Sequence, residues 1–201
     1  PDKLKEEVYQ KVGRYVLFFQ KMEMTLKYIV LNCNLSGYAK EFTQILGANY
    51  QKIQKQTMGN LVKQFLKKNL TEHYDVPEAP DDLDDVLFSM RIAIGLDEIQ
   101  FQKIKQDLES VVAGRNELVH HVMSKFGQEA DEVKRRYSII QYLDQQYDDA
   151  KAKDVFLQSF LKTIQKVKKD YSDFLLSEKG EWLFKAMFLQ ISPPCPKFEK
   201  N

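Results

Sequence analysis

The sequence predicts an all-α fold: an antiparallel helical bundle with two or three long helices. Glycine and proline, the residues that most often interrupt helices, occupy only eight and six of the 201 positions. Apolar residues recur at steps of three and four over long stretches, which places them on one face of a helix. No segment alternates regularly between apolar and polar residues, the pattern typical of a half-buried strand.

Length and composition indicate one globular domain, with a core over about 2–176 and a C-terminal extension over 177–201. The net charge is +1, so no global basic field marks the chain as a nucleic-acid binder. It shows no run of about 18 apolar residues that would span a membrane, and no secretory signal. Cys33 and Cys195 are far apart and fit no metal-ligand spacing. We therefore expect a reducing, cytoplasmic location and neither a metal nor a cofactor.

The first half of the chain is expected to hold three helices. The first runs over about 2–31 and carries a continuous apolar face. A break follows over 32–37, and a shorter helix lies near 38–46. Thr57 is the expected N-cap of a third helix that ends near Asn69.

The next part of the chain is expected to be a loop over 71–80, because two prolines within it prevent a continuous helix. Asp81 can then cap a short helix that runs through Met90. At the other end of the chain we expect a short helix over 181–190 and an extended tail over 192–196.

Two long helices are expected between these segments. Asp97 is the predicted N-cap of the first, which covers about 98–125 and ends at Gly127. The second covers about 129–176, and its polar centre over 145–154 is a place where it can bend.

The most informative stretch is 115–120, Arg-Asn-Glu-Leu-Val-His, inside the helix expected over 98–125. Apolar residues on both sides of Arg115 share one helical stripe with it, at steps of three and four. The stripe consists of Ile104, Leu108, Val111, Arg115, Leu118 and Val122. Arginine is rarely placed in such a seam, because burying its fixed charge unpaired costs on the order of several kcal/mol. Asn116 and His120 are four positions apart and therefore share a helical face beside the seam.

A histidine near a fixed cation suits RNA cleavage without a metal. The 2′-hydroxyl of RNA attacks the neighbouring phosphate once a base removes its proton, a role that His120 can fill. The forked donors of Arg115 match the charge that builds on the phosphorane, and Asn116 can orient the phosphate or the imidazole. A symmetric dimer through this helix would supply both a base and an acid.

Arg115-Asn116-x-x-x-His120 resembles the Arg-x(4–6)-His signature of the HEPN superfamily, including its preferred polar residue directly after the arginine. The order of helices over about 5–175 is similar as well. The segment 57–62, Thr-Met-Gly-Asn-Leu-Val, resembles a Thr-Leu-Gly-x-Leu-Ile/Val element of some bacterial members. The resemblance implies a small helical bundle that dimerises through the motif helices and acts as a metal-independent ribonuclease in toxin–antitoxin or antiviral defence systems.

The resemblance also implies roles and partners. His120 would be the general acid or base, Arg115 the transition-state stabiliser and Asn116 the orienting group, with RNA as substrate, a 2′,3′-cyclic phosphate as product and an antitoxin or inhibitor protein as partner. Some toxin members carry a tyrosine two residues after the histidine, which a partner nucleotidyltransferase modifies. Val122 stands at that position here, so this form of regulation is not expected.

Other residues are candidates for supporting roles. Family analogy makes Glu23 a supporting acid. His121 points about 100° away from His120 around the helix and is a possible substrate contact. A run of lysines without an intervening acid is a candidate RNA-binding strip: Lys52, Lys55, Lys63, Lys67 and Lys68. The acidic run over 72–85 lacks the spacing of a calcium loop and is better interpreted as a solvated loop. The aromatic residues at 18–19 and at 156 and 160 are expected in the core rather than as base-stacking platforms.

Two alternatives to this function stay open. Arg115 can instead pair with an acid from another helix, Glu23 being one candidate, and hold the bundle together. The chain would then be a catalytically silent helical module that binds a protein, a nucleotide or RNA. A nuclease that stays inactive until a phage trigger or a ligand arrives is the other alternative.

Overall fold

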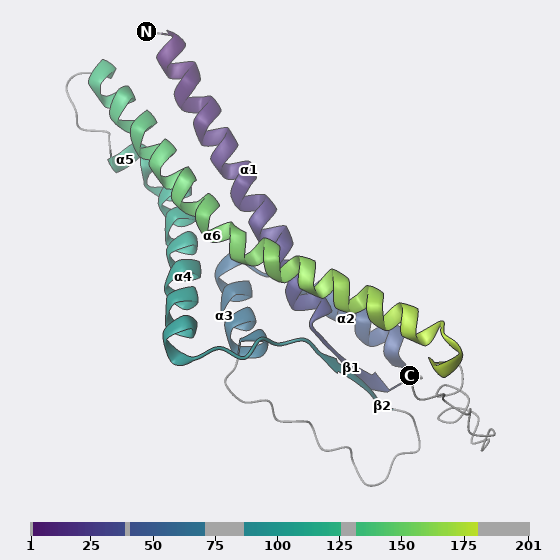
Figure 1. Ribbon diagram of the computed structural model, residues 1–201. Coiled ribbons are helices and arrows are strands. Elements are labelled where there is room, and N and C mark those ends of the chain that lie inside the picture. The colour runs from purple at the N-terminus through teal and green to yellow at the C-terminus, as the bar shows by residue number, and fades with distance from the viewer. Residues whose placement is uncertain (1, 39–40, 71–86, 126–131, 181–201) are drawn as a thin grey trace.

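The computed structural model describes residues 2–38, 41–70, 87–125 and 132–180 (Figure 1). Within these ranges the chain forms six helices and one pair of short strands. In chain order the elements are α1 (Asp2–Asn32), β1 (Asn34–Tyr38), α2 (Phe42–Gln54), α3 (Met58–Asn69), β2 (Leu87–Arg91), α4 (Glu98–His120), α5 (Val122–Lys125) and α6 (Glu132–Leu175). The predicted all-α bundle is confirmed, and its three long helices are α1, α4 and α6.

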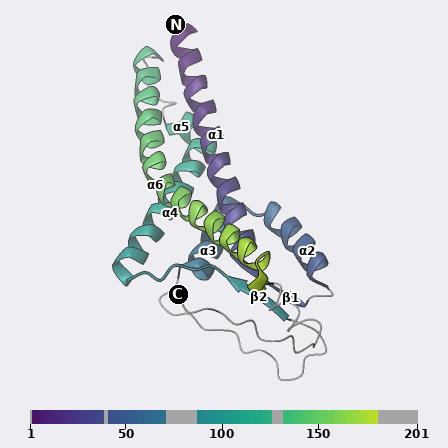
Figure 2. The same ribbon diagram turned by 45° about the vertical axis from the view of Figure 1, so that its right-hand side comes forward.

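The two longest helices, α1 and α6, lie side by side and run in the same direction (Figures 1 and 2). Hydrogen bonds between them join residues that are 130 to 136 positions apart in the sequence. The bonded pairs are Lys11–Asp144, Arg14–Asp144, Tyr15–Gln146, Thr25–Gln158 and Asn32–Lys168. Because the offset is nearly constant, the N-terminal ends of α1 and α6 lie at the same end of the bundle.

Helix α4 runs opposite to this pair. A Cβ atom added to Gly114 would lie 3.5 Å from the hydroxyl oxygen of Tyr15 and 3.7 Å from Oε1 of Gln146. Nearer the start of α4, Oγ of Ser110 accepts a hydrogen bond of 2.8 Å from Nζ of Lys153. Later residues of α4 therefore meet earlier residues of α6. The C-terminal end of α4 points toward the end of the bundle where α1 and α6 begin.

The core lies where α1, α3, α4 and α6 face one another. Its largest completely buried side chains come from all four helices: Met22, Leu26, Ile29, Leu61, Phe65, Leu108, Leu143, Leu157, Phe160 and Ile164. Phe65 of α3 meets Phe160 of α6 edge to face, with 5.2 Å between ring centroids. Phe19 is also buried, and Phe18 and Phe156 pack against the core. The expectation that these aromatic residues belong to the core is confirmed.

The third predicted helix is present as α3, and its N-cap is Thr57 as expected. The Thr57 side chain accepts a hydrogen bond of 3.5 Å from the backbone N–H of Asn60. The helix expected near 38–46 instead lies further along, as α2. The reason for this shift is that Tyr38 is the last residue of strand β1 and is therefore extended.

The sequence predicts no strands, and the two strands β1 and β2 contradict that expectation. Strand β1 pairs antiparallel with β2, from Asn34 opposite Arg91 to Tyr38 opposite Leu87. The prediction of a short helix from Asp81 through Met90 is therefore wrong from residue 87 on, where the chain forms β2. The first part of that predicted helix lies outside the described residues. The two strands are far apart in the sequence, so local periodicity does not reveal their pairing.

Several expectations fall outside the described residues: the loop over 71–80, the helix end at Gly127, the helix over 181–190 and the tail over 192–196. The last long helix is present as α6, and it passes through its polar centre over 145–154 without interruption.

The N-cap of α4 fixes where the motif helix starts. Oδ1 of Asp97 accepts a hydrogen bond of 2.7 Å from the backbone N–H of Gln100, as the sequence predicts. We expect Asp97→Ala to lower the free energy of unfolding by about 1 kcal/mol, because that N–H loses its partner. Asp97→Asn keeps a side-chain acceptor, so its free energy of unfolding should fall clearly less. Urea unfolding followed by circular dichroism measures both variants, and equal losses would contradict the role of the cap.

Cys33, which follows α1, is completely buried. Burial raises the pKa of its thiol from 9.0 to about 12, and the nearby charge of Lys168 offsets part of this shift. Because the folded-state pKa is raised, the protonated thiol contributes its full stabilisation below the unfolded-state pKa of about 9. This contribution is lost as the pH rises from there through the folded-state pKa.

The raised pKa of Cys33 predicts a contribution to the pH dependence of stability that is present in the wild type and absent from Cys33→Ala. Above about pH 9 the wild type should lose up to about 1.4 kcal/mol of stability per pH unit through this thiol, and Cys33→Ala should not. The stability gap between the two proteins should therefore narrow between about pH 8 and about pH 10 in urea unfolding. A constant gap would show that the thiol is not held protonated by the fold.

Candidate active site at the end of α4

The apolar stripe that the sequence predicts on α4 faces the core. Leu108, Val111 and Leu118 are no more than 4% exposed, and Val122, just beyond the helix, is 5% exposed. Arg115 lies on the same stripe and is partly buried. The prediction of an arginine within an apolar seam is confirmed.

Arg115 makes a hydrogen bond to its neighbour in the sequence and no ion pair with any residue that the structure describes. Its Nη1 atom donates to Oδ1 of Asn116, 3.2 Å away. Glu23, the acid considered as its partner, pairs with Lys27 on α1, with 2.8 Å between Oε1 and Nζ. Most of the five N–H donors of the guanidinium are therefore not used by the part of the chain that the structure describes.

The position of Glu23 explains why it does not reach Arg115. Tyr15 of α1 lies beside Gly114, at the level of the motif. Glu23 is eight residues further along α1, about 12 Å at a rise of about 1.5 Å per residue. This displacement leads away from the C-terminal end of α4, because α1 and α4 run in opposite directions. An ion pair between Glu23 and Arg115 is thus not part of this fold.

Two histidines stand at the end of α4. His120 is its last residue, and His121 caps it with a backbone N–H that donates to the carbonyl oxygen of Glu117 at 2.8 Å. The sequence predicts a helix that continues to about residue 125 and turns His121 away from His120. The chain instead leaves the helix at His121, and Val122, the next residue, is buried. Both imidazoles are exposed, and their ring centroids lie 6.1 Å apart.

Asn116 lies between the arginine and the histidine. Its side chain is exposed, accepts the hydrogen bond from Arg115 and stands one turn before His120 on the same face. Arg115 and His120 are five residues apart, which separates them by about 140° around the helix. Within one chain the cation and the imidazole therefore leave α4 on different faces.

All five lysines of the strip are exposed, and those toward the end of α3 lie away from the histidines. Lys63 and Lys67 belong to α3, whose Gly59 packs against Val112 of α4. The end of α3 lies near the start of α4, since the backbone of Asn69 pairs with residue 94. His120 is eight residues beyond Val112 in one direction, and Lys67 is eight residues beyond Gly59 in the other. At about 1.5 Å per residue the two lie about 24 Å apart along the bundle, so the fold does not bring Lys67 to the motif.

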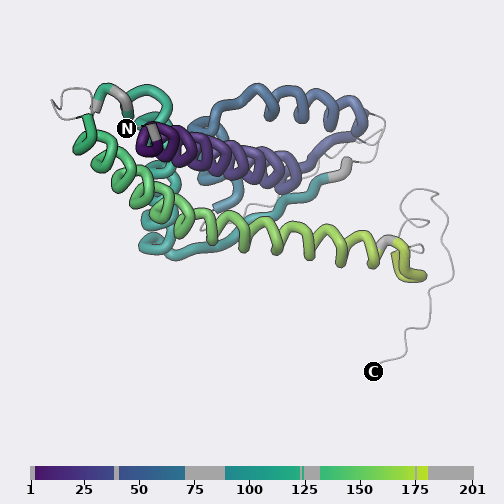
Figure 3. The backbone as a smooth tube through the Cα atoms, turned by 90° about the horizontal axis from the view of Figure 1, so that it is seen from above, coloured from purple at the N-terminus to yellow at the C-terminus, as the bar shows by residue number. Residues whose placement is uncertain are grey.

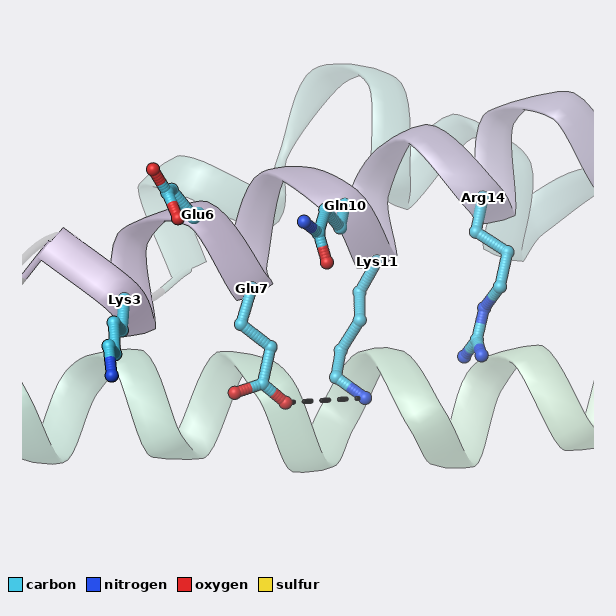
Figure 4. Close-up of a pocket in the computed structure, with 6 residues that line it drawn as sticks. All are labelled: Lys3, Glu6, Glu7, Gln10, Lys11 and Arg14. Carbon is cyan, nitrogen blue, oxygen red and sulfur yellow. Dashed lines mark ion pairs between the residues drawn. The ribbon is translucent and has the colours of Figure 1, made fainter.

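A shallow depression on α1 does not resemble an active site. Figure 4 shows its lining, which comes from one helix and carries charges of both signs: Lys3, Glu6, Glu7, Gln10, Lys11 and Arg14. Nζ of Lys11 is already engaged, at 3.6 Å from Oε1 of Glu7 and 2.7 Å from Oδ1 of Asp144. The ionic groups thus neutralise one another.

A second pocket, between the first turns of α1 and α6, has cationic walls that the sequence did not indicate. Its lining includes Lys5 and Tyr9 from one end of the chain and Arg135 and Arg136 from the other half. Only the parallel arrangement of α1 and α6 brings these residues together, and no local pattern in the sequence predicts that arrangement.

Among the described residues, no group of three or more His, Cys, Asp or Glu side chains is placed to hold a metal ion. None of the helices in those residues is long and apolar enough to cross a membrane. No protein-family model, curated protein or solved structure matches this chain.

The surroundings of Arg115 predict that its charge contributes little to stability. We expect Arg115→Met to change the free energy of unfolding by less than about 0.5 kcal/mol, because methionine keeps an apolar stem in the seam and no ion pair is lost. The comparison variant Leu118→Ala, one turn along the same stripe, should lose about 2–5 kcal/mol. Urea unfolding measures both. A loss above about 2 kcal/mol in Arg115→Met would mean that the arginine is structural.

Proposed function

We propose that this protein is a metal-independent endoribonuclease of the HEPN type. The observation that carries the proposal is Arg115, a guanidinium in an apolar seam that bonds to Asn116 and forms no ion pair among the described residues. A structural arginine in such a seam would normally pair with an acid, whereas no described acid pairs with this one, so its donors could bind a phosphate. The exposed His120 at the helix end and the HEPN-like spacing of Arg115, Asn116 and His120 support the same function.

The proposed reaction is an internal transfer within RNA. One imidazole removes the proton of a 2′-hydroxyl, whose oxygen forms a bond to the adjacent phosphorus. The bond from phosphorus to the 5′-oxygen breaks, and that oxygen takes a proton from a second imidazole, which acts as the acid. Arg115 stabilises the negative charge on the phosphorane, and Asn116 holds the guanidinium in place. The products are a 2′,3′-cyclic phosphate and a 5′-hydroxyl.

A homodimer through α4 completes the site in this proposal. Arg115 and His120 leave one helix on different faces, so a second copy is needed to bring both types of group to one phosphate. Val119, next to His120, is 50% exposed although it is apolar, and a two-fold contact between two α4 ends would cover it. Two copies of His120 would then provide one base and one acid.

The biological role that fits this activity is that of a toxin or an antiviral-defence effector. An unregulated ribonuclease would degrade the RNA of its own cell, so the proposal includes an antitoxin or inhibitor protein as a partner. The HEPN resemblance supports this role, and the histidines at the end of α4 are the surface that such a partner would cover.

A binding module without catalysis is the second candidate, and a groove between α1 and α6 favours it. Leu17 and Met24 are 66% and 69% exposed and line this groove together with Tyr28 and Leu161. Apolar side chains that gather on one exposed surface are typical of protein-binding sites. In this function RNA would not be cut.

The proposed function predicts cleavage of a mixed tRNA and mRNA pool in EDTA. His120→Ala should reduce the rate by about 10²–10⁴-fold, because the proton transfer loses its base or acid. His73→Ala, which changes the only histidine of the sequence outside the end of α4, should cleave at the wild-type rate. Gel analysis of the RNA measures all three proteins, and circular dichroism checks that the helical content is unchanged.

Two outcomes would contradict this mechanism. Cleavage that requires a divalent metal ion, or that persists in His120→Ala, would exclude the proposed chemistry. Cleavage of a DNA strand would exclude it as well, since DNA has no 2′-hydroxyl. If the wild type binds partners through the α1–α6 groove and cuts no RNA, the binding module is the correct function.

A further inference from the structure

The pocket between the first turns of α1 and α6 has cationic walls around a buried apolar part. It is lined by Lys5, Val8 and Tyr9 of α1 and by Arg135, Arg136 and Ile139 of α6. Val8 and Ile139 are 5% and 2% exposed. The remaining four side chains are three cations and one phenol, and none of the described residues that line the pocket is an acid.

The cations of this pocket are only partly neutralised. Arg136 pairs with Glu132, with 3.0 Å between Nη2 and Oε2. Arg135 is partly buried and has no hydrogen bond or ion pair with any residue that the structure describes. Nζ of Lys5 lies 5.8 Å from the centre of the Tyr9 ring. Counted over the described residues, the pocket therefore carries a net positive charge, and none of them occupies the forked donors of Arg135.

The pocket lies at the same end of the bundle as the histidines. Tyr15 of α1 lies beside Gly114 of α4. Tyr9 is six residues before Tyr15, and His120 is six residues after Gly114. Because α1 and α4 run in opposite directions, both steps lead the same way along the bundle, by about 9 Å. Figures 1 and 2 show that the end of α4 and α5 lie in the part of the molecule where α1 and α6 begin, and Figure 3 shows the same arrangement from above.

We propose that this pocket binds a backbone phosphate of single-stranded RNA, next to the phosphate that is cleaved at His120. The identity of the ligand rests on the proposed ribonuclease function. A guanidinium with no partner among the described residues can bind the oxygens of a phosphate in a forked geometry. Tyr9 is 58% exposed and offers a ring on which an unpaired base can stack, as in other sites for single strands.

The three cations contribute unequally to this site. Arg135 is the main phosphate ligand, because nothing that the structure describes competes for its donors. Arg136 supports it from its ion pair with Glu132, and that pair also stabilises the first turn of α6. Lys5 adds charge at the edge of the pocket and lies over the ring that receives the base. Arg135 is therefore the residue whose change tests the proposal with least effect on folding.

The test is binding of a fluorescently labelled single-stranded RNA that is 2′-O-methylated throughout, so that it cannot be cut. Fluorescence anisotropy with the full chain gives the dissociation constant for wild type, Arg135→Ala and Arg135→Lys. We expect Arg135→Ala to weaken binding about tenfold and to reduce the salt slope by about 0.7, the value for one phosphate contact on a single strand. Arg135→Lys keeps the charge and should lose less. Lys162→Ala, an exposed lysine of the same helix far from the pocket, is the matched control and should bind like wild type.

The outcomes separate this proposal from the ribonuclease itself. Unchanged RNA affinity in Arg135→Ala overturns the pocket, even if the wild type cleaves RNA through His120. If Arg135→Ala binds RNA more weakly and Lys162→Ala does not, the phosphate site in the pocket is supported. This holds even if the wild type cuts no RNA and the nuclease function is thereby rejected. Equal losses in Arg135→Ala and Lys162→Ala would show a diffuse charge effect and also overturn it. A wild type that does not bind RNA overturns both.

Discussion

The parallel contact between α1 and α6 is the constraint on which the rest of the structure depends. Its hydrogen bonds extend from Lys11–Asp144 to Asn32–Lys168, and a continuous apolar core lies beneath them. Two parallel helices cannot be joined by a short turn, because the first ends at the opposite end of the bundle from where the second begins. The chain between them must return along the whole bundle, and α4 is the helix that makes this return. Its C-terminal end, with the motif, therefore arrives where α1 and α6 start.

Close packing at Gly114 sets the position of the motif within this frame. Tyr15 donates a hydrogen bond of 2.9 Å to the backbone oxygen of Gln146, and both residues lie against Gly114. Burial raises the pKa of Tyr15 well above its usual value, and the nearby Tyr142 and Asp149 add to this shift, so the phenol stays a neutral donor. Arg115 follows directly after this contact. The guanidinium thus starts from a closely packed point of the fold, which suits its proposed role of binding a phosphate in a fixed geometry.

Local signals predicted much of the fold, and long-range pairing accounts for what they missed. The caps at Thr57 and Asp97 and the apolar stripe through Arg115 depend on residues within a few turns of one another, and all three are confirmed. The strands β1 and β2 pair across a long stretch of sequence, which periodicity does not encode. For the site, the spacing of Arg115, Asn116 and His120 was readable from the sequence. The pairing of Glu23 with Lys27, the turn at His121 and the pocket around Arg135 depend on how helices meet in space.

In the proposed function, residues at the end of α4 promote cleavage of RNA, in which a 2′-hydroxyl of the RNA attacks the adjacent phosphate. The most direct measurement is the mass of the ends that the wild-type protein produces from a defined single-stranded RNA in EDTA. The account predicts a 2′,3′-cyclic phosphate on one fragment and a 5′-hydroxyl on the other. Fragments with a 5′-phosphate and a 3′-hydroxyl would show attack by water on the phosphate and would contradict it.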